Sequence, residues 1–169
     1  VKQMWLDSNQ IRSLGPKFFD GLSSLEELYL TSNQIESVDS QAFDGLLSLT
    51  FLDIHFNQIT SIAAKTFDGL VNLTILHLHL NRISSIDSQA FNGLTNLIEL
   101  RLNDNELTAI DSKTLTDLIS LKSLFLNTNN IEKIEPMTFS RLSKLDMLFF
   151  NNNQLKSLES MAFYGLSSL

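Results

Sequence analysis

The stretch from Leu25 to Ile35 reads LEELYLTSNQI, and the stretch from Leu73 to Ile83 reads LTILHLHLNRI. Both fit the frame L-x-x-L-x-L-x-x-N-x-[LI], which occurs seven times in the 169 residues. Its asparagine recurs every 24 residues, at Asn9, Asn33, Asn57, Asn81, Asn105, Asn129 and Asn153. A fixed period of this size indicates one structural unit stacked on copies of itself. The sequence therefore predicts a solenoid, and the phase of the repeat decides which residues are buried.

The apolar residues of the frame predict one strand in each repeat. With the asparagine counted as position 9, positions 4 and 6 are apolar, as in Leu28 and Leu30. Alternation with a period of two over such a short run is typical of a strand with one buried face. Equivalent strands are expected to pair in parallel and in register. The apolar residues at positions 11 and 14, such as Ile35 and Val38, are expected to fill the core behind the strand.

Three further columns of the repeat predict how each coil turns. Position 19 is phenylalanine in six of seven copies, with Leu115 the exception, and is expected to stack as an aromatic spine. Five of the six glycines share position 21, which indicates a turn that needs a positive φ or close packing. The asparagine amide at position 9 is expected to satisfy backbone groups of the neighbouring coil.

The composition excludes several classes of partner and site. Nineteen acidic residues against twelve basic ones give a net charge of -7, whereas a nucleic-acid binder needs positive charge to neutralise phosphates. The absence of cysteine excludes a disulfide framework, a redox thiol and a thiolate metal site. No apolar run approaches the roughly 20 residues that span a bilayer, so this span is not expected to insert into a membrane.

The full 24-residue form, with phenylalanine at position 19 and Gly-Leu at positions 21 and 22, resembles the typical class of leucine-rich repeat proteins. Within that class the sequence looks most like the variable lymphocyte receptors of jawless vertebrates and related receptor-like proteins of basal chordates. The resemblance implies an α/β solenoid curved into a horseshoe. A parallel β-sheet would line its concave face, with loops and short 3-10 or helical turns on the convex face.

The same resemblance implies an extracellular protein, secreted or on the cell surface. The triplet Asn72-Leu73-Thr74 is an N-glycosylation candidate that fits this location, although such triplets also arise by chance in sequences rich in Asn, Ser and Thr. The resemblance covers residues 1–169, which we interpret as a single leucine-rich repeat domain. It comprises about seven repeats, five complete internal ones plus partial or terminal ones.

Members of this family normally carry cysteine-stapled caps at both ends, and this span has none. Because each repeat touches only its neighbours, the ends of an uncapped stack expose apolar residues such as Val1 and Leu169. We therefore expect this span to be a fragment, or a chain whose capping segments were removed.

Side chains at positions 3, 5 and 7 are predicted to point away from the core onto the concave face, with position 8 at its rim. The frame does not dictate these residues, yet large apolar groups stand among them, including the only tryptophan, Trp5. A monomer that exposes such a strip usually keeps it for a partner. The predicted ligand-binding residues on this face are Glu27, Tyr29, Phe51, Asp53, His55, His77, His79, Glu99, Arg101, Asp104, Phe125 and Phe149.

The charges on this predicted face are unequal. One cation, Arg101, lies among five acids, which are Asp7, Glu27, Asp53, Glu99 and Asp104. The face is therefore predicted to be negative, which favours a cationic or hydroxyl-rich partner, either a protein antigen or a bacterial cell-surface polymer. The alternative is that these acids are ordinary solvation in an acidic protein.

All three histidines are expected to lie together, with His55 beside His79 and His77 beside Asp53. Three imidazoles and a carboxylate make a zinc-like site or a pH switch conceivable. However, Leu78 is demanded by the frame, so His-x-His is no independent motif, and three ordinary surface histidines are the preferred interpretation. We predict no metal site and no cofactor.

An enzyme is not predicted, and no catalytic residue is assigned. The sequence lacks a serine elbow and a phosphate-cradling glycine loop, and an open curved face does not exclude water as acid–base catalysis requires. The preferred function is a non-enzymatic recognition receptor that binds antigen or a microbial surface. The alternative is an extracellular adhesion or structural protein–protein interaction module, which the strip from Phe125 to Phe149 would serve equally well. A metal-dependent enzyme at the histidines ranks third.

Overall fold

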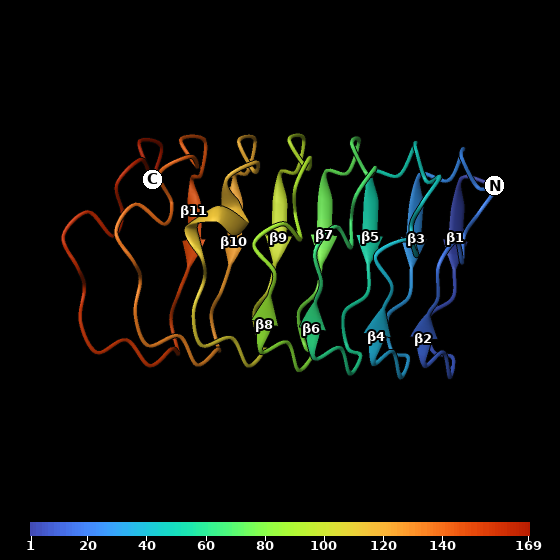
Figure 1. The fold of residues 1–169 in the computed structure, drawn as a ribbon, viewed down its shortest axis with the longest axis horizontal. Helices are drawn as coiled ribbons and strands as arrows, with labels where there is room; N and C mark the ends of the chain where they lie inside the picture. The colour runs from blue at the N-terminus through green and yellow to red at the C-terminus, as the bar shows by residue number, and fades with distance from the viewer.

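The computed structural model describes residues 1–169 as a stack of coils, each contributing one strand to a seven-stranded parallel sheet (Figure 1). The strands follow one another across the sheet in chain order. They are β1 (Gln3–Trp5), β3 (Glu27–Tyr29), β5 (Phe51–Asp53), β7 (Ile75–His77), β9 (Glu99–Arg101), β10 (Ser123–Phe125) and β11 (Met147–Phe149). Because every pair is offset by one repeat, the predicted parallel, in-register solenoid is confirmed.

The buried core follows the apolar frame. Leu28, Leu52 and Leu76 at position 4 are fully buried, as are Leu30 and Ile54 at position 6. The core is one continuous cluster that also contains the residues at position 11 of the internal repeats and most of those at position 14. The period-two alternation therefore assigns the buried face of each strand correctly.

The aromatic spine is also confirmed. The rings of Phe19, Phe43, Phe67 and Phe91 stack in series with centroids 5.8–6.0 Å apart, and Phe139 and Phe163 stack at 6.1 Å. Leu115 occupies the place between the two series and is buried. The stack therefore fixes the spacing of the coils on the side opposite the sheet.

The asparagine column satisfies the backbone where each coil bends. Asn81 Oδ1 accepts a hydrogen bond from the Ile59 amide at 3.0 Å, and Asn81 Nδ2 donates to the carbonyls of Ile54, Leu78 and His79 at 3.1–3.3 Å. The same pattern recurs in the other internal repeats, for example at Asn105. The predicted role of this amide is confirmed, since unpaired buried backbone groups are costly.

The side opposite the sheet contains strand pairs that the sequence analysis did not predict. Strand β2 (Ser13–Leu14) pairs in parallel with β4 (Ser37–Val38), and β6 (Ser61–Ile62) pairs with β8 (Ser85–Ile86). One 3-10 helix, η1 (Ser112–Leu115), is capped by Asp111, and no helix in the structure is long and apolar enough to cross a bilayer. Figure 1 shows these short strands in a second row below the main sheet.

The glycine column marks a turn that L-residues rarely adopt. All five glycines at position 21 have a positive φ, +81° at Gly69 and +95° at Gly165. At Gly165 an added Cβ would also lie 2.6 Å from the Cα of Ser140, closer than packed atoms allow. Asp117 and Arg141, which replace glycine at this position, are not among the residues with positive φ, so the left-handed turn is specific to the glycine repeats.

Candidate functional site

The outward face consists of the side chains at positions 3, 5 and 7 along the seven-stranded sheet. Strand register brings the predicted residues into two rows, in which Glu27 neighbours Phe51 and Tyr29 neighbours Asp53. The exposed fraction is largest near the two ends of the sheet, at 63% for Trp5 and 41% for Phe149. The centre of the face is more tightly covered, and Asp53 is only 8% exposed.

A hydrogen-bonded network of acids and histidines occupies this centre. The Asp53 Oδ1 atom lies 2.6 Å from His55 Nδ1, and Asp53 Oδ2 lies 3.7 Å from His77 Nδ1. His77 Nε2 in turn lies 3.1 Å from Glu99 Oε1, to which the Arg101 Nε also donates at 2.6 Å. The sheet register therefore joins β5, β7 and β9 through one chain of polar contacts.

The network changes the expected electrostatics of the face. Burial opposes ionisation of Asp53, but its contacts with the His77 and His55 imidazoles outweigh it and lower the pKa of Asp53 to about 2. Burial likewise opposes ionisation of Glu99, and the hydrogen bonds from Arg101 and His77 hold its pKa below the ordinary value. Two imidazoles cover the Asp53 carboxylate, so it contributes less accessible charge to the face than its place among the five acids predicts. Asp7, Glu27 and Asp104 are less deeply buried than Asp53.

His79 is held in its neutral form. Its ring stacks on His55 with centroids 4.3 Å apart, and its buried Nδ1 has no hydrogen-bond partner. Burial lowers the pKa of His79 to about 4, and the neighbouring His55 and His77 add to this effect. The three histidine rings pack against one another, and two of them contact Asp53. No group of three His, Asp or Glu side chains has the arrangement of a metal site.

Aromatic groups flank the central network on both sides. Trp5 stacks on Tyr29 at 4.3 Å, and Phe51 follows at 5.1 Å. The Tyr29 hydroxyl donates to Glu27 Oε2 at 2.8 Å, a bond that raises the pKa of Tyr29 and fixes the direction of the carboxylate. Since Gln3 Nε2 donates to the same oxygen, Glu27 is held in place among aromatic rings.

The second aromatic group lies towards the C-terminal end of the sheet. Phe125 and Phe149 stack at 4.6 Å, and the guanidinium of Arg101 lies 4.8 Å from the centroid of the Phe125 ring. Arg101 thus links the charged centre to the apolar end of the face. The sheet brings together all the predicted residues at positions 3, 5 and 7, in three adjoining clusters.

The rim, at position 8, has a feature that sequence reasoning missed. All seven residues of this column have φ between 53° and 57°, including Phe56 and Leu80. Bulky side chains rarely adopt this left-handed conformation, which costs about 1–3 kcal/mol outside glycine. The polar residues elsewhere in the column, such as Ser32 and Asn152, could have indicated this left-handed turn from the sequence. Phe56 and Leu80 are nevertheless 58% and 43% exposed.

Two remaining candidates lie away from these clusters. Asp104 belongs to the rim, where its Oδ2 accepts a hydrogen bond from Asn103 Nδ2 at 2.6 Å. Asn72 is exposed, lies in the turn before β7 and outside positions 3, 5 and 7, and its Nδ2 donates to the Leu47 carbonyl at 2.8 Å. The glycosylation candidate is therefore separate from the outward face.

Comparison with protein-family models identifies the class of repeat. Residues 1–59 match a model described as leucine rich repeat, and residues 60–169 match a model described as BspA type leucine rich repeat region with six copies. The chain belongs to the leucine-rich repeat family. Its fold is that of a protein–protein interaction module. A comparison with curated proteins gave no match.

Among solved structures, 440 chains match. One is the crystal structure of a TLR13–ssRNA13 complex, which aligns with a TM-score of 0.89 and 34% sequence identity. The alignment covers 94% of the present chain and 22% of that chain, so this chain spans less than a quarter of its relative's length.

Proposed function

We propose that this chain is the recognition part of an extracellular, non-enzymatic receptor of the variable lymphocyte receptor type. It forms a single domain that curves into a horseshoe, with the seven-stranded sheet on the concave side. A protein antigen docks on the outward face. The observation that supports this proposal best is the Trp5–Tyr29–Phe51 aromatic cluster beside an oriented Glu27 carboxylate, since the frame of the repeat requires none of these side chains.

The partner that this face suits is apolar at its contact points and carries positive charge. Phe149 and Trp5 supply exposed rings, which are the residue types that anchor protein interfaces. Asp7, Glu27 and Asp104 supply the carboxylates that steer a cationic partner or bind a hydroxyl-rich bacterial polymer. The net charge of -7 disfavours nucleic acid, although the similar TLR13 structure is titled as a complex with ssRNA13.

An adhesion module is the second candidate. The stacked Phe125–Phe149 pair and the half-exposed Met147 lie at one end of the outward face, where a second copy of the chain would bury them. In this alternative, sedimentation shows a dimer whose population increases with protein concentration and decreases in Phe149→Ala.

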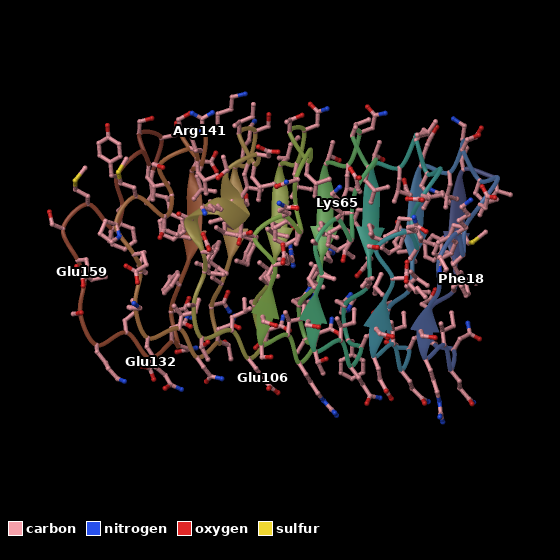
Figure 2. The ribbon with its side chains drawn as sticks, viewed as in Figure 1. Phe18, Lys65, Glu106, Glu132, Arg141 and Glu159 are labelled. Carbon is pink, nitrogen blue, oxygen red and sulfur yellow. The ribbon has the colours of Figure 1, made fainter.

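The test compares two exposed phenylalanines on different sides of the coil. Phe149 lies on the outward face and is 41% exposed, whereas Phe18 lies elsewhere, is 50% exposed and contacts Phe19 edge-on. Figure 2 labels Phe18 at the N-terminal end of the stack. Binding is measured to three probes: a displayed library of small protein domains, fixed bacterial cells and a 13-nucleotide single-stranded RNA.

Domains selected on the parent chain are expected to bind Phe149→Ala at least tenfold more weakly and Phe18→Ala unchanged. Glu27→Gln is expected to reduce the salt dependence of binding, since it removes one steering charge. Equal binding by the parent and by Phe149→Ala would refute the outward face as the site. Tight RNA binding would refute the exclusion of nucleic acid.

A further inference from the structure

A groove of about 390 Å³ runs along the rim beside the turns that follow β3, β5, β7 and β9. Its only apolar lining comes from Phe56 and Leu80, at the same position in successive repeats, and its charged lining comes from Arg82 and Asp104. The rest is amide side chain, including Asn57 and Asn81 of the structural column. The groove is therefore an open apolar slot with a polar floor. Figure 2 shows Glu106, at the same repeat position as Arg82, projecting from this edge of the coil.

Phe56 and Leu80 adopt a left-handed backbone conformation that bulky side chains disfavour. Phe56 has φ 54° and Leu80 has φ 53°, and the turn is fixed by amide hydrogen bonds from Phe56 to His79 and from Leu80 to Asn103. Neighbouring repeats place Ser32 and Thr128 in the same conformation. The fold therefore does not require a large apolar side chain here, and the two side chains are only partly buried, which leaves little burial to offset the strain.

The charges of the groove differ from those of the outward face. Arg82 forms no ion pair, whereas the Asp104 carboxylate is occupied by Asn103 at 2.6 Å and lies beyond ion-pair distance of Arg82. In a chain of net charge -7, a cation without an internal partner beside an apolar slot is complementary to one kind of ligand. That ligand carries an apolar group next to a carboxylate.

We propose that this groove docks a segment of the protein partner in which a leucine-like side chain precedes an acidic residue. The apolar side chain lies between Phe56 and Leu80, and the carboxylate pairs with Arg82. This inference rests on the proposed function, because it assigns a second contact to the same partner. The partner therefore presents positive charge to the sheet and a Leu-Asp type of segment to the rim.

The experiment uses four blocked tetrapeptides and amide chemical-shift mapping of the isotope-labelled chain. The probes are acetyl-Gly-Leu-Asp-Gly-amide and its Leu-Asn, Ser-Asp and Leu-Lys counterparts. The Leu-Asp peptide is expected to shift the amides of Phe56, Leu80 and Arg82. The Leu-Asn and Ser-Asp peptides are expected to bind at least fivefold more weakly. Absence of shifts at the groove, or stronger binding of the Leu-Lys peptide through Asp104, would overturn the assignment.

Variants at the same repeat position provide the controls. Phe56→Asn and Leu80→Asn are expected to weaken the Leu-Asp peptide at least tenfold, while Ser32→Asn and Thr128→Asn leave binding unchanged. Arg82→Gln is expected to bring the Leu-Asp peptide to the affinity of the Leu-Asn peptide. If the library domains still bind the outward face while the peptides do not shift the groove, the rim assignment fails and the proposed function stands. If Phe149→Ala has no effect on the domains, the proposed function fails regardless of the peptides.

Discussion

Positions 8 and 9 of the repeat are adjacent in the chain, yet their side chains differ in burial and have opposite effects on the stability of the fold. Position 9 is always asparagine, and in the internal repeats its amide is buried and bonded to backbone groups of two coils. Position 8 changes in nearly every copy and lies at the rim in a left-handed conformation. The asparagines at position 9 stabilise the fold, whereas Phe56 and Leu80 at the variable position 8 destabilise it through backbone strain. Function is therefore to be sought where side chains vary and are strained.

The largest expected effect is loss of an internal asparagine. Asn81→Ala leaves the buried Ile59 amide without an acceptor and removes one of the two donors to the Ile54 and Leu78 carbonyls, and is expected to lower the free energy of unfolding by about 3 kcal/mol. Asn9→Ala is the matched control, since Asn9 is exposed and bonds only within its own turn. Urea unfolding followed by circular dichroism would contradict this account if the two variants lost equal stability.

The next effect concerns pH at the outward face. His79 has a folded pKa of about 4 against an ordinary 6.5, so between these values the unfolded chain binds a proton that the folded chain does not. Stability is therefore expected to decrease as pH falls from about 6.5 to about 4, by roughly 1–2 kcal/mol after solvent screening.

The variant that tests this assignment is His79→Asn, because asparagine occupies the same position in later repeats, for example at Asn103 and Asn127. It is expected to flatten the stability profile between pH 6.5 and 4. Asp53 contributes separately, since its depressed pKa stabilises the fold above about pH 4 and that stabilisation is lost as pH falls to about 2. An unchanged slope in His79→Asn would show that another group titrates.

A smaller difference in stability is expected between alanine substitutions at two glycines, Gly69 and Gly15. Gly69 has φ +81° with no atom close to an added Cβ, so Gly69→Ala is expected to cost about 1 kcal/mol through backbone strain alone. Gly15 has ordinary φ and equally open space, so Gly15→Ala is expected to be neutral or slightly stabilising. Thermal unfolding of both variants measures the difference, and equal loss at the two sites would argue against a special turn at position 21.

Much of the fold could be predicted because the same residue types recur at the same repeat positions in seven copies. Once the phase of the repeat is known, it assigns each repeat position to the core or to the surface. Leu28 and Phe43 are accordingly buried, and Tyr29 is on the outward face. The pairing of Ser13–Leu14 with Ser37–Val38 was not predicted, since two residues are too few to give a period. The left-handed backbone at Phe56 escaped prediction because its side chain is the opposite of what that conformation favours.

The face itself was predictable as a set of columns but not as a set of contacts. Register placed Asp53 beside His77, as the sequence predicted. The covering of Asp53 by two imidazoles and the stacking of His79 on His55 depend on side-chain rotamers, which the repeat does not specify. The sequence therefore located the accessible acids less well than it located the sheet.

The most direct measurement is the free energy of unfolding of Phe56→Asn/Leu80→Asn relative to the parent chain. Asparagine tolerates the left-handed conformation that Phe56 and Leu80 adopt, and neither side chain belongs to the buried core. We predict that the double variant is more stable by about 1–2 kcal/mol, because the backbone strain that is relieved exceeds the partial burial that the two side chains lose. A double variant that is less stable than the parent would show that these residues serve the fold, and the distinction between the two columns would not hold.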